Sequence, residues 1–419
     1  MGQRKVAVVG AGVAGLTAAH LLSSAREVTL YEADGRLGGH AHTRELAGPG
    51  GRSVFVDSGF IVHNERTYPT LLRLFDELGV ATQDAEMSMS VRCDGCALEY
   101  AGARGPAGLF ASRGALRGRY LRLLAEVPFF HRAARRLLAR GGDPGVTFGD
   151  FLHDHGFSPY FVGHFALPLV SAVWSCPART ALVYPATYLF AFLDHHGLLS
   201  VTGSPRWRTV TGGSAAYVAA AAKNIQRVLT GSPVETVRRT GRGALVTTRD
   251  GVAEAYDAVV IATHPDQALR MLADPTPDER RVLGAFPYSR NPTVLHTDTS
   301  VLPRSPRARA SWNYRLTGCD PSTDPVRVSY DMRRLQRLPA GAEYVVTLGG
   351  DDLVAPDRVV ERMVYEHPVY TPASVAAQRE LPGLNTGVTA YAGAWHGWGF
   401  HEDGCRSGVL AALSLGVRW

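Results

Sequence analysis

The sequence predicts an α/β fold of about two domains, one of which is assembled from separate parts of the chain. The 419 residues exceed the size at which a single hydrophobic core keeps growing. Near the N-terminus, a short apolar strand runs into a glycine-rich turn and an apolar helix. A second glycine turn into an apolar helix, and a second buried strand, occur within residues 209–265. We expect these two regions to share a domain and the stretch between them to form another.

The first element is a strand over residues 6–9, followed by the sequence GAGVAG. Gly10, Gly12 and Gly15 have the GxGxxG spacing. Gly10 permits the tight turn, Gly12 lets the backbone approach a pyrophosphate, and Gly15 lets the helix pack on the strand. The next strand, EVTLYEAD, ends at Glu32, close to the spacing at which a carboxylate accepts from a ribose hydroxyl. We therefore predict a Rossmann-type dinucleotide-binding unit with phosphates at the helix N-terminus.

The residues after Glu32 indicate which dinucleotide binds. In ADGRLGGHAHTRE, Arg36, Gly38, Gly39 and Thr43 supply a cation and more backbone that can approach a ligand closely. This longer contact suits FAD better than NAD.

A further segment, VDSGFIVHNERTYP, places Asp57, Gly59 and Phe60 where the chain could turn beneath an isoalloxazine ring.

Changes of pattern divide the chain into five segments. TLLRLFDELGV is typical of an amphipathic helix, while TVLHTDTS, VRVSYDM and AEYVVTL alternate as in an antiparallel sheet. We predict a discontinuous FAD-binding domain and an α+β substrate domain built on that sheet. The FAD-binding domain takes residues 1–67, 204–286 and 385–419, and the substrate domain takes residues 68–203, mostly helical, and 287–384.

The C-terminal segment YAGAWHGWGFHEDGCRSGVLAA combines glycines, aromatic rings and a helix that starts near Glu402. A helix N-terminus carries free N–H groups and partial positive charge, which a reduced, anionic flavin needs near its pyrimidine edge. This pattern favours a segment that returns to the flavin. The alternative is a glycine-rich helix cap with buried aromatic residues.

Many segments in order resemble the FAD-dependent amine-oxidase-like flavoproteins. They include GGHAHT, DSGFIVHNERTYP, AVWSCP, HHGLLS, WRTVTGGSAAYV, VVIATHPDQAL, VLHTDTS, ASWNYR, YEHPVY and GFHEDGCRSG. Within that group the chain is most similar to the bacterial family often encoded beside cyclopropane fatty acid synthases. The resemblance implies an amine-oxidase-like fold, bound FAD and action on fatty acyl or related lipid chains.

The resemblance also implies a set of cofactor contacts. The residues expected to contact FAD are Gly10, Gly12, Val13, Ala14, Gly15, Glu32, Ala33, Arg36, Gly38, Gly39, His40, Thr43, Gly59, Phe60, Ile61, Val234, Ala262, Thr263, Gly393, Trp395, Gly399, Phe400 and His401.

Four residues are candidates for catalysis. His401 and Glu402 would lie beside the flavin edge, or only shape the helix start, while His196 and Trp174 would line the site, or only pack in the core. The chain has two lysines, Lys5 and Lys223, so no lysine is evident for the flavin N5 position that amine oxidases commonly use.

Two further positions also disfavour amine chemistry. Phe400 aligns with a tyrosine of the amine-oxidase aromatic cage, and Ala394 replaces the usual acidic residue.

The sequence favours an FAD-dependent oxidoreductase that removes a hydride from a lipid-like or polyene acyl chain. The outcome would be desaturation or, if the hydride returns, redox-neutral double-bond isomerisation. The apolar segments FALPLVSAVW and ATYLFAFL could line a tunnel for such a chain or be ordinary core helices. The alternatives are an amine or amino-acid oxidase and a non-catalytic lipid-binding protein.

The distribution of charge limits the kinds of partner that the chain can bind. Nine arginines and a single acid, Glu126, lie within 104–140, which indicates either a solvated helix face or contact with an anionic membrane, a lipid headgroup or an acidic carrier of an acyl substrate. No nucleic-acid recognition motif accompanies the charge.

The five cysteines include one lone CxxC pair, Cys93 and Cys96. We expect free thiols, no metal site, no transmembrane helix and a cytoplasmic location.

Overall fold

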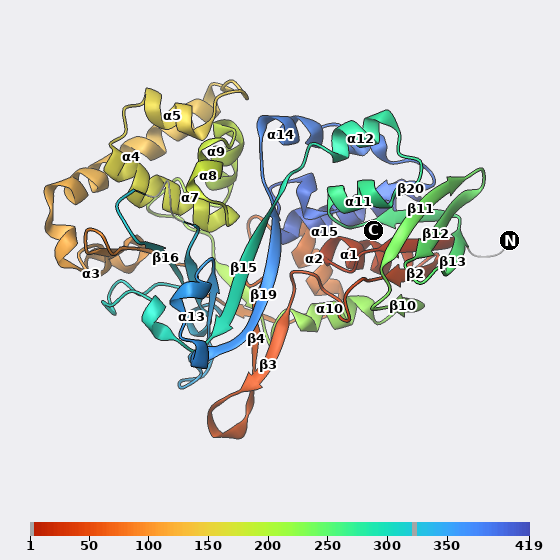
Figure 1. The fold of residues 1–419 in the computed structure, drawn as a ribbon, viewed down its shortest axis with the longest axis horizontal. Helices are drawn as coiled ribbons and strands as arrows, with labels where there is room; N and C mark the ends of the chain where they lie inside the picture. The colour runs from red at the N-terminus through yellow and green to blue at the C-terminus, as the bar shows by residue number, and fades with distance from the viewer. Residues whose placement is uncertain (1–3, 321–324) are drawn as a thin grey trace.

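The computed structural model describes residues 4–320 and 325–419, in which two large sheets form the centres of two lobes (Figure 1). The sheet of the first lobe has five parallel strands in the order β10-β2-β1-β14-β20. Its strands are β1 (Lys5–Val9), β2 (Glu27–Tyr31), β10 (Arg227–Leu229), β14 (Ala258–Ile261) and β20 (Thr389–Tyr391). Three separate parts of the chain therefore build this sheet, as a discontinuous FAD-binding domain requires.

Helices cover one face of the five-stranded sheet, and a β-meander covers the other. The helices are α1 (Val13–Leu22), α2 (Pro69–Glu77), α10 (Ala215–Ala222) and α15 (His401–Ser414). The meander is β11 (Val234–Thr240), β12 (Gly243–Thr248) and β13 (Ala253–Tyr256), which packs with α11 (Pro265–Met271) and α12 (Pro277–Leu283). Alternate residues of each sheet strand enter the two cores, as expected for strands buried on both faces.

The second lobe contains a seven-stranded sheet in the order β19-β15-β18-β17-β16-β7-β8. Its strands are β7 (Met89–Cys93), β8 (Leu98–Ala101), β15 (Tyr288–His296), β16 (Trp312–Leu316), β17 (Val328–Asp331), β18 (Val345–Leu348) and β19 (Val359–Pro368). Every neighbouring pair is antiparallel except β16 and β7, which are parallel. The predicted antiparallel sheet is therefore present, with one parallel junction. The long strands β15 and β19 run side by side through the middle of the molecule (Figure 1).

A helical layer lies beside this sheet at the end of the second lobe (Figure 1). Its helices are α3 (Gly105–Leu109), α4 (Gly118–Ala139), α5 (Phe148–Asp154), α6 (Pro159–Phe161), α7 (Leu167–Trp174), α8 (Ala178–Leu182) and α9 (Ala186–His195), with a π-helical turn over Val162–Ala166. Their shared core is rich in phenylalanine, with Phe130 and Phe190 fully buried. Among the described residues, no helix is both long enough and apolar enough to cross a bilayer.

Smaller elements join the lobes. The hairpin of β3 (Thr43–Ala47) and β4 (Ser53–Asp57) projects from the molecule, and β9 (Trp207–Val210) pairs with β5 (His63–Asn64) and β6 (Thr82–Asp84) (Figure 1). Helices α13 (Met332–Gln336) and α14 (Pro372–Gln378) complete the fold.

One domain assignment changes. The predicted substrate domain starts at residue 68, yet Leu71, Leu74 and Phe75 of α2 lie in the core of the five-stranded sheet, because the apolar face of this helix packs there.

Candidate functional site

The glycine turn after β1 leaves space at the start of α1. A Cβ on Gly15 would come 1.8 Å from the Gly10 carbonyl oxygen, whereas a Cβ on Gly12 would meet nothing within 4 Å. Helix α1 follows Gly12 without a side-chain cap and without an acidic residue in its first turn. The space beside Gly12, at the start of the helix whose first turn includes Val13 and Ala14, is therefore open, as the approach of a pyrophosphate requires.

Glu32 directly follows β2 and lies beside this turn. Its carboxylate accepts from the backbone N–H of Ala11 at 2.7 Å and of Asp34 at 2.9 Å. The amides of Gly231 and Ser232 donate to the carbonyls of Asp34 and Glu32, each at 2.8 Å. These bonds bring the start of β11, with Val234, beside Glu32 and the exposed Ala33.

The segment after Glu32 folds back over the glycine turn. The Gly38 amide donates to the Ala11 carbonyl at 2.8 Å, and the Arg36 guanidinium donates to the Gly39 carbonyl at 2.8 Å. Gly38 has a φ of 109°, a backbone conformation that favours glycine. Burial lowers the pKa of Arg36, although an arginine stays charged at neutral pH.

Thr43 belongs to a buried network centred on Asp57. Its hydroxyl donates to Asp57 Oδ1 at 2.6 Å, and the amide and hydroxyl of Ser214 and the Gln336 amide group also donate to this carboxylate. Burial raises the pKa of Asp57 in spite of these donors. The network fixes β4 against the start of α10. Thr43 therefore stabilises the position of these two elements through Asp57.

Beyond Asp57 the chain passes close to His40. A Cβ on Gly59 would lie 2.2 Å from the His40 carbonyl oxygen, which accepts from the Phe60 amide at 2.7 Å. Ile61 is buried directly after Phe60. His40 also faces Tyr365 and His367, with ring centroids 5.0 and 5.3 Å away.

The C-terminal segment meets the glycine turn from the other side. Trp395 is almost fully buried and donates to the Thr263 carbonyl at 3.1 Å, which places it in the core behind the turn. Ala262 and Thr263 themselves pack against Gly10 and Gly15.

Gly393 precedes Trp395 in this segment. Its amide donates to the Ser407 hydroxyl of α15 at 2.8 Å. Every residue from 396 to 402 is half-buried, in the middle of the fold. Gly399 has a φ of 94° and passes Tyr370 so closely that a Cβ would lie 2.8 Å from its hydroxyl.

His401 and Glu402 have different surroundings. The His401 ring stacks on Phe60 at 3.6 Å, and its Nε2 lies 3.1 Å from the Tyr217 hydroxyl. Burial lowers the pKa of His401 to about 3. Both carboxylate oxygens of Glu402 instead accept from the amides of Thr70 and Leu71, at 3.1 and 2.9 Å, so this side chain caps α2.

Aromatic side chains from α7 and α9 line the other side of the C-terminal segment. Trp174 Nε1 donates to the Trp398 carbonyl at 3.2 Å. The Phe192 ring lies 4.8 Å from Trp174 and stacks on both His196, at 3.9 Å, and Phe400, at 4.7 Å. We call these five residues the aromatic wall.

The structure adds residues that the sequence analysis missed. The Gly397 carbonyl accepts from the Tyr188 hydroxyl at 2.7 Å and from the Gln378 amide group at 2.6 Å, which holds the C-terminal segment against α9 and α14. No local pattern marks these side chains, since Tyr188 lies 209 residues before Gly397 and Gln378 lies 19 residues before it, in a different helix. Asp403 lay within the quoted GFHEDG motif, and its carboxylate accepts from the Phe400 amide at 3.1 Å.

The ionisable groups here are mostly uncharged or already paired. Burial lowers the pKa of His40 well below its usual value, and those of His196 and His367 to about 4. Asp403, whose pKa burial raises to about 6, also pairs with Arg406 at 3.2 Å. The two lysines are exposed, at the start of β1 and the end of α10.

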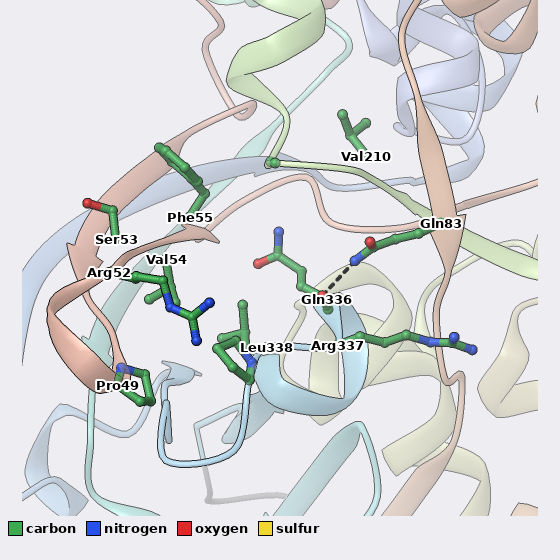
Figure 2. A pocket seen from close by; sticks show the side chains of 13 residues that line it. Pro49, Arg52, Ser53, Val54, Phe55, Gln83, Val210, Gln336, Arg337 and Leu338 are labelled. Carbon is green, nitrogen blue, oxygen red and sulfur yellow. Dashed lines mark hydrogen bonds between the residues drawn. The ribbon is translucent and has the colours of Figure 1, made fainter.

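A separate cavity of about 300 Å³ lies between the β3–β4 hairpin and α13 (Figure 2). Figure 2 shows Arg52 extending toward Leu338, and Gln83 donating to the Gln336 carbonyl at 2.7 Å. None of the residues that line it belongs to the predicted FAD or catalytic sets.

Comparisons with known proteins agree with this geometry. The family model of flavin-containing amine oxidoreductases matches residues 13–299. The protein named flavin-containing monoamine oxidase AofH, from Mycobacterium tuberculosis, is 29% identical over 300 residues, covering 68% of this chain and 63% of that protein. Putrescine oxidase from Kocuria rosea is 29% identical over 255 residues, covering 58% of this chain and 50% of the oxidase. The chain thus spans about half to two thirds of the length of these relatives.

Two solved structures share the fold over nearly all of both chains. The CLA-producing fatty acid isomerase from P. acnes has a TM-score of 0.70, 16% identity and 97% coverage of each chain. Cyclohexylamine oxidase from Brevibacterium oxydans has a TM-score of 0.69, 16% identity and 99% coverage of each chain. Because the family model covers more than half of the chain and the glycine turn suits a dinucleotide, the chain belongs to the family of flavin-containing amine oxidoreductases, with FAD as its cofactor.

Proposed function

We propose that this oxidoreductase removes a hydride from a lipid-like or polyene acyl chain, giving a desaturated or isomerised product. One observation carries the proposal: the aromatic wall stacks around the C-terminal segment, and burial lowers the pKa of the histidines there so that they are neutral at pH 7. An apolar chain loses little on entering such surroundings, whereas an ammonium group would need a carboxylate or another strong acceptor.

The bound FAD would supply the hydride acceptor. The chain's own residues would hold the cofactor through the α1 amides and Glu32, and the aromatic wall would exclude water. His196 is the proposed proton acceptor. Its Nδ1 donates to the Phe192 carbonyl at 3.0 Å, so the neutral ring keeps the Nε2 lone pair free to take a proton.

Amine or amino-acid oxidation is the second candidate, because the relatives at 29% identity have names of that class. The local chemistry disfavours it. Glu402 caps α2, Asp403 pairs with Arg406, and both lysines are exposed at the start of β1 and the end of α10, so these two carboxylates and the lysines are not placed to bind an amine. A non-catalytic lipid-binding role would leave the flavin-binding features without a purpose.

Anaerobic mixing distinguishes the candidates. Acyl lipids, free fatty acids and carrier-bound acyl chains should bleach the oxidised flavin spectrum, or be rearranged without net bleaching, as product mass spectrometry would show. Amines should do neither. Bleaching by amines together with inert acyl compounds would favour amine oxidation. If the protein binds FAD but no compound bleaches the flavin or is converted to a product, the non-catalytic lipid-binding role would be favoured.

A matched pair of variants tests the assigned proton acceptor. His196→Gln should lower kcat about 100-fold with little change in KM. This loss is at the low end of the range for removing a general base, because an imidazole with a pKa of about 4 is a weak base. His401→Gln removes the stacking on Phe60 and should weaken FAD binding instead. Steady-state kinetics and FAD titration check both. Unchanged kcat in His196→Gln would remove His196 from the mechanism.

We further propose that α4 and the residues around it contact an anionic membrane that delivers the substrate, at a cytoplasmic surface. Several large apolar side chains are exposed here: Phe110 (43%), Leu116 (72%), Leu121 (50%) and Phe129 (40%). Within the described part of the chain, Arg132, Arg136 and Arg140 form no ion pair. A cavity of about 430 Å³ opens beside Arg132, Arg135 and Arg136. Exposed arginines beside apolar side chains are typical of interfacial binding.

Vesicle sedimentation tests this contact. Glutamine at Arg132, Arg136 and Arg140 should weaken binding to phosphatidylserine vesicles about 100-fold, at roughly 1 kcal/mol per arginine. Glutamine at the exposed Arg238, Arg242 and Arg249 of the β-meander should have little effect. No binding of the wild-type protein to anionic vesicles, with binding to an acidic acyl carrier, would identify a carrier as the partner.

The group within the family is also a proposal. The ordered motifs that include AVWSCP, HHGLLS and GFHEDGCRSG support placement with the flavoproteins encoded beside cyclopropane fatty acid synthases. Mapping the neighbouring genes would test it.

A further inference from the structure

Four potential metal ligands converge in the second lobe, away from the glycine turn. Cys93, Cys96, His164 and Cys319 place one ligand atom each within 4.8 Å of one another, and the first three residues are buried. They come from the end of β7, the following turn, the π-helical turn between α6 and α7, and the loop after β16. The sequence predicts free thiols and no metal site, because Cys93 and Cys96 form a lone CxxC pair.

The distances fit a tetrahedral zinc ion. In tetrahedral geometry, Zn–S bonds of about 2.3 Å and Zn–N bonds of about 2.0 Å separate two sulfurs by about 3.8 Å and a sulfur from a nitrogen by about 3.5 Å. Cys93 Sγ and Cys319 Sγ are 3.9 Å apart, and Cys96 Sγ lies 3.6 Å from His164 Nε2. A disulfide would need its sulfurs at about 2.05 Å, so the observed spacing matches shared coordination better than a bridge.

The histidine is oriented as a ligand. His164 lies in the π-helical turn, a rare conformation that is frequent at functional sites. Its Nδ1 lies 3.0 Å from the Tyr160 carbonyl, which can only accept, so Nδ1 carries the proton and the Nε2 lone pair faces Cys96. Metal-bound histidines commonly donate their other N–H to a carbonyl in this way.

The loops that carry the cysteines are also held in place. Asp94, inside the CxxC turn, pairs with Arg315 of β16 at 2.9 Å. A Cβ on Gly95 would lie 3.1 Å from the Gly318 Cα, so the two loops pack backbone to backbone. Ala97, directly after Cys96, has a φ of 54°, a strained conformation that persists where the surroundings determine it.

We propose that Cys93, Cys96, His164 and Cys319 bind one zinc ion. On binding, three thiols lose their protons to solvent and form three zinc–sulfur bonds, while neutral His164 supplies the fourth ligand. The complex carries one negative charge, and Arg119, whose guanidinium lies 4.7 Å above the Tyr160 ring, is the nearby cation. Four protein ligands leave no open position, so the ion has a structural role and ties the helical layer to β7 and β16.

Metal analysis of the purified, FAD-loaded protein tests the proposal. We expect about one zinc per chain by mass spectrometry of the elements. Cobalt exchanged into the site should give thiolate charge-transfer bands and tetrahedral d–d bands, the latter to the red of the flavin spectrum. Cys96→Ser and His164→Ala should lose the metal, whereas Cys176→Ser, which changes a buried cysteine outside the cluster, should keep it.

The wild-type protein decides the outcome if a variant fails to fold. Wild-type protein grown with ample zinc but holding no stoichiometric metal, and giving no tetrahedral cobalt spectrum, would overturn the proposal. A disulfide between any two of these cysteines, found by mass spectrometry without reductant, would also overturn it. Removing zinc with a chelator should lower the Tm and leave the FAD content unchanged, because the cluster lies in the other lobe.

Discussion

At the scale of single residues, Glu402 shows how a charged side chain beside a flavin site can serve the fold. Helix α2 begins at Pro69 after Tyr68, which offers no side-chain cap, and Glu402 supplies the missing acceptor from α15. Glu402→Ala should therefore destabilise the protein by about 1 kcal/mol, within the usual range for a lost helix cap. Thermal unfolding measures this change.

The same variant separates structure from catalysis. Glu402→Ala should retain FAD and keep kcat within a few-fold of the wild-type value, since its carboxylate is already engaged with α2. A loss of kcat comparable to that of His196→Gln, at unchanged stability, would show that Glu402 takes part in the reaction.

Two neighbouring glycines predict opposite outcomes. Gly12 has a φ of −70°, and a Cβ there meets nothing, so Gly12→Ala should fold normally. Its methyl group would occupy the space in front of the α1 amides, and FAD affinity should fall at least about 10-fold. Gly15→Ala should instead reduce folding, because its Cβ would collide with the Gly10 carbonyl. Circular dichroism and FAD titration distinguish the two. Normal FAD affinity in Gly12→Ala would exclude the pyrophosphate from this position.

At the scale of elements, a buried ion pair connects the β-meander to β20, the strand that leads into the C-terminal segment. Glu279 of α12 accepts from Arg239 of β11 at 2.8 and 2.9 Å and from the Tyr391 hydroxyl of β20 at 2.6 Å. Its side chain is only 2% exposed, so little solvent screens the pair.

Glu279→Gln should cost about 2–3 kcal/mol, the range for losing hydrogen bonds to a charged group. Because β20 precedes Gly393, we also expect weaker FAD binding. Urea denaturation with and without FAD measures both effects. As a control, Glu380→Gln removes a solvent-exposed pair with Arg281 and should change stability much less than Glu279→Gln does. Equal effects of the two changes would contradict the burial argument.

The sequence predicts elements well where the signal is local. The strand–glycine turn–helix unit at Gly10, the apolar strand β14 and the helix after Phe400 follow from short patterns and appear as expected. Long-range pairings could not be predicted in this way. The parallel junction of β16 with β7, and the approach of Cys319 to Cys93, join residues more than 200 positions apart, which no local pattern encodes.

The same contrast between local patterns and long-range contacts applies to the candidate site. The backbone conformations that the glycine pattern predicts are present, with Gly10 and Gly38 at positive φ and open space at Gly12, whereas their contacts with FAD stay a prediction. The role of a side chain depends on what the fold brings to it. Thr43 binds Asp57, Trp395 lies in the core, and Glu402 caps a helix from another part of the chain. Only the folded structure determines these contacts.

At the scale of the whole molecule, buried histidines set the response to acid. Burial is the largest cause of a lowered pKa for eleven of the fifteen histidines. A histidine with a folded-state pKa near 4 and an unfolded value near 6.5 binds more protons when unfolded between these pH values. Stability from these groups is therefore present above pH 6.5 and is lost as the pH falls toward 4.

Asp403 acts in the opposite direction. Burial raises its pKa from 3.8 to about 6, so its contribution to stability is present below about pH 4 and is lost as the pH rises through 6. Burial also raises the pKa of Asp57 and Asp331, so a few carboxyls oppose the larger number of imidazoles. Each imidazole can contribute up to about 1.4 kcal/mol per pH unit where it titrates. Protonation also adds positive charge to a chain that already carries +6 at pH 7.

We therefore expect the urea midpoint of unfolding to fall steeply from pH 7 to pH 5 at constant ionic strength. His131→Leu provides the control, because His131 is buried in α4, its Nε2 has no hydrogen-bond partner, and burial lowers its pKa to about 4. Leucine fills similar space and cannot be protonated, so the variant should match or exceed the wild-type midpoint at pH 7 and lose less of it at pH 5. If the urea midpoint falls equally in both proteins, His131 does not contribute. If the wild-type midpoint stays constant from pH 7 to pH 5, the histidines as a group do not govern acid stability.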